Sequence, residues 1–176
     1  FQCPYCREVT STIDDLLTRH GDDVRIVFRN NPLAIHADAK AAAKAALAAG
    51  RQGKFWAMHD KLFESQFELS SAKYREYAVA IGLDATKFDT DFAEAALDRR
   101  IEEDLAVAKR FGVTGTPAFF VNGRFLSGNQ PAGVFDRVIN EELSRARTFV
   151  ERRGNTRKRL YDDMVSRWAT EVSRAA

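Results

Sequence analysis

The chain has 176 residues, 45% of them hydrophobic and 30% charged, a composition typical of a globular protein. Its net charge of +2 gives no electrostatic reason to expect nucleic acid binding, and no apolar run is long enough to span a membrane. The segment from Arg145 onward is locally basic, with nine Lys and Arg residues against four Asp and Glu. Because the first residue is Phe1 and no signal peptide precedes it, we expect a processed chain or a piece of a longer one.

The two cysteines of the chain lie at its start, in the motif Cys3-Pro4-Tyr5-Cys6. Cysteines three residues apart on the first turn of a helix share one face and can form a disulfide. Pro4 suits the first helical position, and the positive end of the helix dipole favours a thiolate at Cys3. The spacing therefore predicts thiol–disulfide exchange, with Cys3 as the nucleophile and Cys6 as the more shielded resolving thiol.

Two other interpretations of the motif are weaker. A structural zinc site needs two further ligands, and His20, His36 and His59 show no ligand-like spacing, so no metal and no cofactor are expected. A disulfide within one helical turn closes too short a loop to stabilise the fold much.

The first half of the chain reads as helix, strand and then a helical block. A helix over residues 7–20 ends at Gly21, and the β-branched residues 24–29 predict a strand that stops at Asn30-Asn31-Pro32. An Ala-rich helix over residues 37–49 follows, with small side chains that allow close helix packing. The next helix has a core stripe at helical spacing, made of Phe55, Met58, His59, Leu62, Phe63 and Phe67.

On this stripe His59 is expected to be a core or boundary histidine rather than a ligand. Ser70 or Ser71 caps the following helix, and residues 84–111 form helix in two pieces that close at Gly112. The pattern then changes to a strand over residues 117–121, the hairpin turn Asn122-Gly123 and a strand over residues 124–127. Pro131 opens a further helix.

In this order the elements resemble the DsbA-like branch of the thioredoxin superfamily, from Phe1 to about Leu143. The residues that carry the resemblance are the segments Phe1–Cys6 (Phe-Gln-Cys-Pro-Tyr-Cys), 55–63 (Phe-Trp-Ala-Met-His-Asp-Lys-Leu-Phe) and 112–123 (Gly-Val-Thr-Gly-Thr-Pro-Ala-Phe-Phe-Val-Asn-Gly). The implied fold class is α/β, a thioredoxin-like fold. A helical insertion at about 33–112 lies between strand 2 of that fold, here residues 24–29, and the C-terminal hairpin. The implied domains are residues 1–144, followed by a helical extension or connector at 145–176.

The resemblance also implies the remaining site residues. Pro117 is expected to follow a cis peptide bond in a loop facing the cysteines, which leaves Thr116 to pair with an extended substrate segment. Pro4 and Tyr5 complete the substrate-binding set. In this branch, strong oxidases are expected to have Val where this chain has Thr116 and His where it has Tyr5. The two residues therefore predict an intermediate reduction potential for the cysteine pair.

The family also carries a central strand directly before the cysteines, and this strand is missing from the chain. Without it the strands at 24–29 and 117–121 lack their common neighbour. We therefore expect the missing strand to come from upstream residues or from a second molecule.

These features predict a thiol–disulfide oxidoreductase of the bacterial periplasm or another exported compartment. Expected partners are proteins with thiols or disulfides and a redox partner protein, with a homodimer or an adjacent domain as further options; nucleic acid and membrane contacts are not expected. The alternatives are a cytosolic glutathione-linked reductase, suggested by the glutaredoxin-like Cys-Pro-Tyr-Cys, and a non-enzymatic peptide-binding domain. The direction of electron flow is left open.

Overall fold

The computed structural model describes residues 1–153 of the chain. They divide into two compact units, each with its own core. The first is made of Phe1–Arg7 and Val27–Thr114, and the second of Glu8–Ile26 and the chain from Gly115 onward. The helix α1 (Pro4–His20) has its first turn in the first unit and its remainder in the second.

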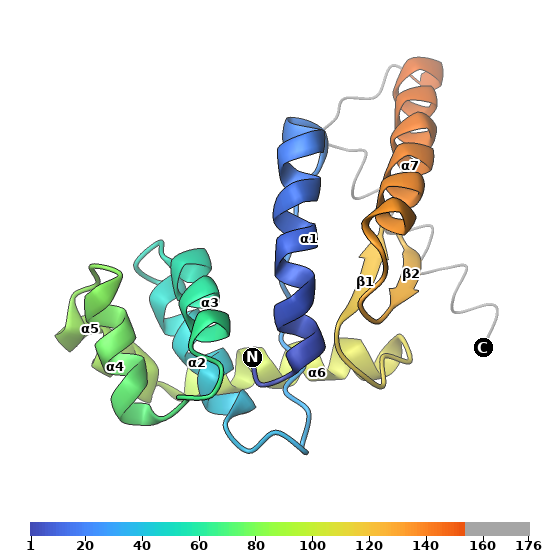
Figure 1. Ribbon diagram of the computed structural model, residues 1–176. Coiled ribbons are helices and arrows are strands. Elements are labelled where there is room, and N and C mark those ends of the chain that lie inside the picture. The colour runs from blue at the N-terminus through green and yellow to red at the C-terminus, as the bar shows by residue number, and fades with distance from the viewer. Residues whose placement is uncertain (154–176) are drawn as a thin grey trace. The chain divides into compact units, whose positions relative to one another are not determined.

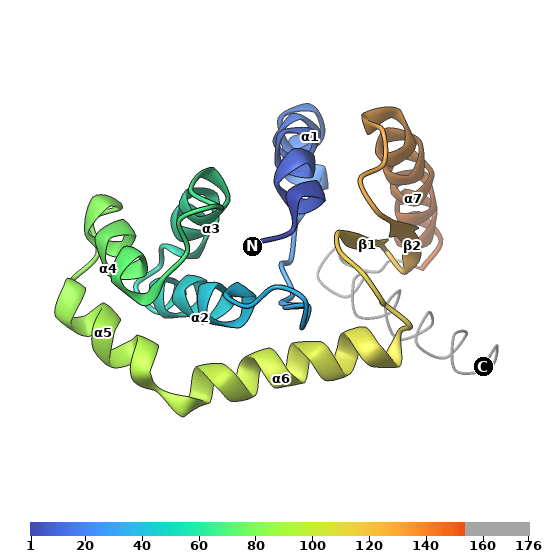
Figure 2. The same cartoon turned by 60° about the horizontal axis from the view of Figure 1, so that its bottom comes forward.

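The first unit is helical and packs around α2 (Ala39–Gly50) (Figure 2). This helix contacts four others, α3 (Phe55–Glu64), α4 (Ser71–Ala80), α5 (Ala85–Ala93) and α6 (Ala95–Arg110). It buries seven alanines, among them Ala42, Ala45 and Ala46, whose small side chains let the neighbouring helices approach closely. The predicted Ala-rich packing helix is confirmed.

Local signals in the sequence set the ends of these helices. Ser70 is the N-cap of α4, where its hydroxyl accepts a hydrogen bond from the Lys73 backbone. The predicted break within residues 84–111 falls at Glu94, which is extended between α5 and α6. Gly112 ends α6 with a φ of +66°, a conformation that favours glycine.

The predicted core stripe of α3 is wrong at one residue, Phe67, which is 87% exposed. The helix ends at Glu64, so the helical spacing no longer decides which side chains point inward. In the turn that follows, Gln66 is buried instead, with 4% exposure. A polar side chain therefore occupies the inward position that the pattern assigned to an aromatic one.

The second unit joins the main part of α1 to a hairpin and a long helix (Figure 1). A short 3₁₀ turn, η1 (Gly21–Asp23), follows α1. Strands β1 (Ala118–Val121) and β2 (Arg124–Ser127) pair antiparallel through the predicted turn, with positive φ at both Asn122 and Gly123. The helix α7 (Ala132–Arg153) completes the unit, and its core joins α1 to α7 through Val9, Leu16, Phe135 and Ile139.

The predicted strand at residues 24–29 is wrong as a strand. Its burial alternates, with the even-numbered residues less exposed than the odd-numbered ones, which is the period of extended chain. In the described part of the chain, however, only β1 and β2 form a ladder. A segment is a strand only when a neighbour supplies a ladder of hydrogen bonds, so residues 24–29 keep the alternating burial of extended chain without forming part of a sheet here.

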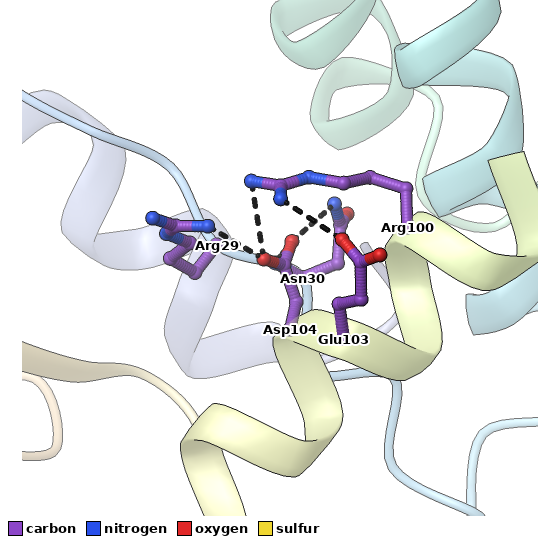
Figure 3. Close-up of polar contacts among 5 residues, drawn as sticks. All are labelled: Arg29, Asn30, Arg100, Glu103 and Asp104. Carbon is purple, nitrogen blue, oxygen red and sulfur yellow. Dashed lines mark hydrogen bonds and ion pairs between the residues drawn. The ribbon is translucent and has the colours of Figure 1, made fainter.

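A buried carboxylate anchors the end of this extended segment in the first unit (Figure 3). Asp104 of α6 is 2% exposed and accepts hydrogen bonds from Arg29 Nη1 at 3.0 Å, Asn30 N at 3.0 Å and Asn30 Nδ2 at 3.2 Å. Arg100 adds a longer ion pair at 3.5 Å. These contacts satisfy a charge that would otherwise be costly to bury.

The helix α7 continues to Arg153 without a break at residue 144, where the sequence placed a domain boundary. The rest of the predicted extension, residues 154–176, lies outside the described residues. The domain boundaries therefore stay a prediction.

Candidate dithiol site

The cysteine motif opens α1 as the sequence predicts. The carbonyl oxygen of Cys3 accepts hydrogen bonds from the backbone nitrogens of Cys6 at 3.2 Å and Arg7 at 3.3 Å, so Cys3 is the N-cap residue. Pro4 is the first helical residue, where its missing N–H costs nothing. The arrangement places Cys3 at the positive end of a 17-residue helix and Cys6 one turn along.

The exposure of the two cysteines is the reverse of the prediction. Cys3 is 6% exposed, whereas Cys6 is half-buried and therefore the less shielded of the two. Within the first unit, hydrogen bonds from Gln66 to the carbonyls of Phe1 and Cys3, and between Asp38 and Gln2, also hold the backbone at the start of the motif. Between the cysteines, Pro4 is exposed and the Tyr5 ring is 60% exposed, so both are available to a substrate.

Two glutamines anchor the backbone at the beginning of the motif. Gln2 donates from Nε2 to the Asp38 carboxylate at 3.0 Å and accepts from the Asp38 backbone nitrogen at 2.7 Å. Gln66 donates from Nε2 to the carbonyl of Phe1 at 2.8 Å and to that of Cys3 at 2.9 Å. The sequence predicts a role for neither glutamine, because no motif marks a side chain that binds backbone groups far away along the chain.

Aromatic rings surround His59 in the same unit. The rings of Phe1, Phe28, Trp56 and Phe63 have centroids between 5.0 and 5.7 Å from the His59 ring. Its Nδ1 lies 2.8 Å from the Asp60 carboxylate. The prediction of a core or boundary histidine is confirmed, and no group of three metal-ligating side chains occurs among the residues that the structure describes.

Thr116 and Pro117 lie in the second unit, directly before β1. The peptide bond between them is cis, which confirms the prediction for Pro117. The carbonyl of Pro117 accepts a hydrogen bond from the Gly128 nitrogen at 2.8 Å, next to the pair formed by Ala118 and Ser127. The hairpin thus holds the buried Pro117 and leaves Thr116 half-buried. The roles of both in substrate binding stay predictions.

A dithiol at the beginning of a helix, a helical block and a cis-proline before a hairpin together define a thioredoxin-like protein of the helix-inserted type. The sequence model of one protein family, the DSBA-like thioredoxin domain, matches residues 1–140. The chain therefore belongs to the DSBA-like thioredoxin domain family, and its fold is the thioredoxin-like DsbA fold, mostly helical with a small antiparallel sheet.

Solved structures agree with this assignment. A thioredoxin-like oxidoreductase from Silicibacter pomeroyi is 28% identical to this chain and superposes on it with a TM-score of 0.73. The match covers 80% of this chain and 80% of the Silicibacter chain. The thiol-disulfide exchange protein alpha-DsbA2 from Wolbachia pipientis is 22% identical over 80% of this chain and 76% of its own, with a TM-score of 0.72. At that lower identity the likeness shows the fold alone.

Curated relatives carry a different name. A protein named Na⁺/H⁺ antiporter NhaA from Herminiimonas arsenicoxydans is 38% identical over 84% of this chain, and NhaA 1 from Salinispora arenicola is 44% identical over 70%. The chain spans only 24% and 19% of the length of these relatives. Among the described helices, none combines the length and the apolar character needed to cross a membrane.

Proposed function

We propose that the chain is a protein thiol–disulfide oxidoreductase that works through Cys3 and Cys6. The observation that carries the proposal is the position of Cys3 as N-cap of α1, with Cys6 one turn along the same helix. The positive end of the helix dipole favours a thiolate at that position. The membership of the DSBA-like family supports the same reaction class.

In the proposed reaction the Cys3 thiolate attacks a substrate disulfide and forms a mixed disulfide, releasing one substrate thiol. Cys6 then attacks the Cys3 sulfur as it gives up its thiol proton, and the second substrate sulfur takes up a proton and leaves as a thiol. The substrate disulfide gains two electrons and the cysteine pair becomes a disulfide. The reverse sequence oxidises a substrate dithiol.

The helix position, rather than exposure, selects Cys3 as the attacking residue. Nucleophilicity depends on the thiolate, and the N-cap position stabilises the thiolate even where the residue is mostly covered. A substrate must therefore come close to the beginning of α1. The exposed Pro4 and Tyr5 are proposed to contact it, and Thr116 with Pro117 to bind its backbone by strand addition.

We propose an intermediate reduction potential for the pair, because Tyr5 brings no positive charge to the dipeptide between the cysteines. The proposed compartment is the periplasm or another exported space, where disulfides persist. A redox partner protein then resets the pair after each cycle.

The curated relatives support the setting of a redox domain joined to a longer chain, since each contains a match to this chain within a much longer protein. Their antiport activity is named for whole proteins, and our proposal for residues 1–153 is limited to exchange chemistry. Immunoblotting of the native protein from its source tests the setting, because an attached domain gives a band several times larger than 19.8 kDa.

The exchange proposal is tested by trapping. The Cys6→Ala variant is expected to accumulate a mixed disulfide at Cys3 with a cysteine-containing peptide disulfide, whereas Cys3→Ala is expected to form none. A mixed disulfide that accumulates only on Cys6 in Cys3→Ala would reverse the two roles. Equilibration with glutathione buffers gives the reduction potential of the pair, in which 30 mV corresponds to about 1.4 kcal/mol.

Equal efficiency with glutathione disulfide and with peptide disulfides would favour the glutathione-linked alternative. Binding of peptides without any exchange would favour the non-enzymatic one.

A further inference from the structure

Gln66 presents a buried polar atom that the exchange mechanism leaves unexplained. Its Oε1 is buried and has no hydrogen-bond partner among the described residues, although the side chain is 96% covered. A buried carbonyl oxygen without a partner is destabilising, and native structures rarely keep one without a reason. The neighbouring dithiol offers that reason.

The orientation of the Gln66 amide follows from its partners. Its two contacts are both backbone carbonyl oxygens, those of Phe1 and Cys3. A carbonyl only accepts hydrogen bonds, so the NH₂ group must face these two atoms and both of its hydrogens are used. The oxygen Oε1, at the other end of the amide, takes no part in these two hydrogen bonds.

The same contacts bring the Gln66 amide next to the backbone of the resolving cysteine, Cys6. The Cys3 carbonyl oxygen accepts from Gln66 Nε2 at 2.9 Å and from the Cys6 backbone nitrogen at 3.2 Å. Gln66 and Cys6 thus donate to a single atom. No sulfur lies within hydrogen-bond reach of Oε1, so a thiol can use this acceptor only through a bridging molecule.

We propose that Gln66 is a positioning residue that holds a water molecule for proton transfer at Cys6. This inference rests on the proposed exchange function. The Nε2 group holds the Cys3 carbonyl in place, and the water donates to Oε1 while it accepts the thiol hydrogen of Cys6. As Cys6 attacks the Cys3 sulfur, its proton passes through the water to the departing substrate thiolate. One S–S bond forms, one breaks, and the substrate leaves as a thiol.

The test separates attack from resolution with dithionitrobenzoate. Attack by Cys3 releases the first thionitrobenzoate, and resolution by Cys6 releases the second. In Gln66→Leu, resolution at neutral pH is expected to be slower by about a hundredfold, the low end of the range for proton-transfer catalysis. Because Leu also removes the two hydrogen bonds from Nε2, the rate of attack by Cys3 is expected to fall as well, but by much less than the rate of resolution. Resolution should recover above pH about 8.5, where a thiol ionises without help.

Gln52→Leu is the matched control. Gln52 also binds backbone, donating to the Asp84 carbonyl at 3.2 Å and accepting from the Asp84 nitrogen at 3.1 Å, in the same unit but in contact with a different loop. Its replacement is expected to leave both phases unchanged. If Gln66→Leu behaved like the control, or if its resolution rate failed to recover at high pH, Gln66 would be a structural residue only.

A measurement on the unsubstituted chain covers the case in which Gln66→Leu does not fold. Resolution is expected to slow more in D₂O than attack does, because only resolution includes the relayed proton. Equal slowing of the two phases would overturn the relay. If the unsubstituted chain released no second thionitrobenzoate at all, the exchange proposal itself would fail, which is a different result.

Discussion

The two units of the chain use different interactions to hold their functional segments. In the first, polar side chains bind backbone groups of distant segments, as Gln66 does at Cys3 and Asp104 at Asn30. In the second, the hairpin binds the carbonyl of Pro117 and an apolar core joins α1 to α7. Its buried carboxylate, Glu142, pairs with the side chains of Arg124 and Arg145. The difference means that single polar substitutions should disturb the first unit, whereas the second should respond to losses from its core.

The largest expected effect comes from the core of the second unit. Phe135 is buried and packs edge-to-face on Phe119 at 4.9 Å, so Phe135→Ala is expected to lower the free energy of unfolding by about 4 kcal/mol. Denaturant unfolding measures the loss. Phe67→Ala, which removes an exposed ring, is expected to change it by less than about 0.5 kcal/mol. Similar losses from both variants would contradict the assigned core.

The next effect tests a polar anchor in the first unit. Asp104→Ala removes three hydrogen bonds and leaves buried donors of Asn30 without an acceptor, so a loss of about 3 kcal/mol is expected. Asp136, a half-buried carboxylate that pairs with Arg19 and His20 in the second unit, is the control. Asp136→Ala is expected to cost about 1 kcal/mol or less. An equal cost for the two would remove the contrast between the units.

Gln2 gives a smaller test of the same contrast. Gln2→Leu removes both hydrogen bonds to Asp38, and the expected loss is about 2 kcal/mol. In the second unit, Arg147→Ala breaks the exposed pair with Asp23 and is expected to cost less than about 0.5 kcal/mol. Thermal unfolding of the two variants side by side measures the difference, and a costlier Arg147→Ala would refute the comparison.

The smallest effect appears only at high pH. Burial raises the pKa of the Tyr74 phenol, with a further contribution from the nearby Asp38 charge. Because the folded state favours the neutral phenol, its contribution to stability is complete below pH about 10 and declines as the pH rises beyond it. Tyr74→Phe is expected to lose less stability than the unsubstituted chain above that pH. The measurement is the free energy of unfolding of both proteins as a function of pH. The same decline in both above pH about 10 would contradict the prediction and show that the Tyr74 phenol is accessible to solvent.

Local chemistry made much of this molecule predictable. The motif Cys3-Pro4-Tyr5-Cys6 predicted its own helix start, because proline at the first position and cysteines three residues apart have few other uses. Asn122-Gly123 predicted the hairpin through the positive φ that both residues tolerate. Ser70 and Gly112 predicted helix ends, since caps depend on neighbours within one turn. The cis bond before Pro117 came from family resemblance, because proline alone does not choose the isomer.

Only the tertiary structure decided the features that join distant segments. Residues 24–29 have the composition of a strand, yet pairing depends on a neighbour that no local pattern reveals. The inward turn of Gln66 and the outward turn of Phe67 follow the end of α3, where helical spacing stops. The greater burial of Cys3 than of Cys6 is likewise a property of the folded chain, in which Gln66 binds the Cys3 carbonyl from more than sixty positions away. Hydrogen bonds at such separations are set by the packed fold, so the sequence determined the chemistry of the site and the fold determined its surroundings.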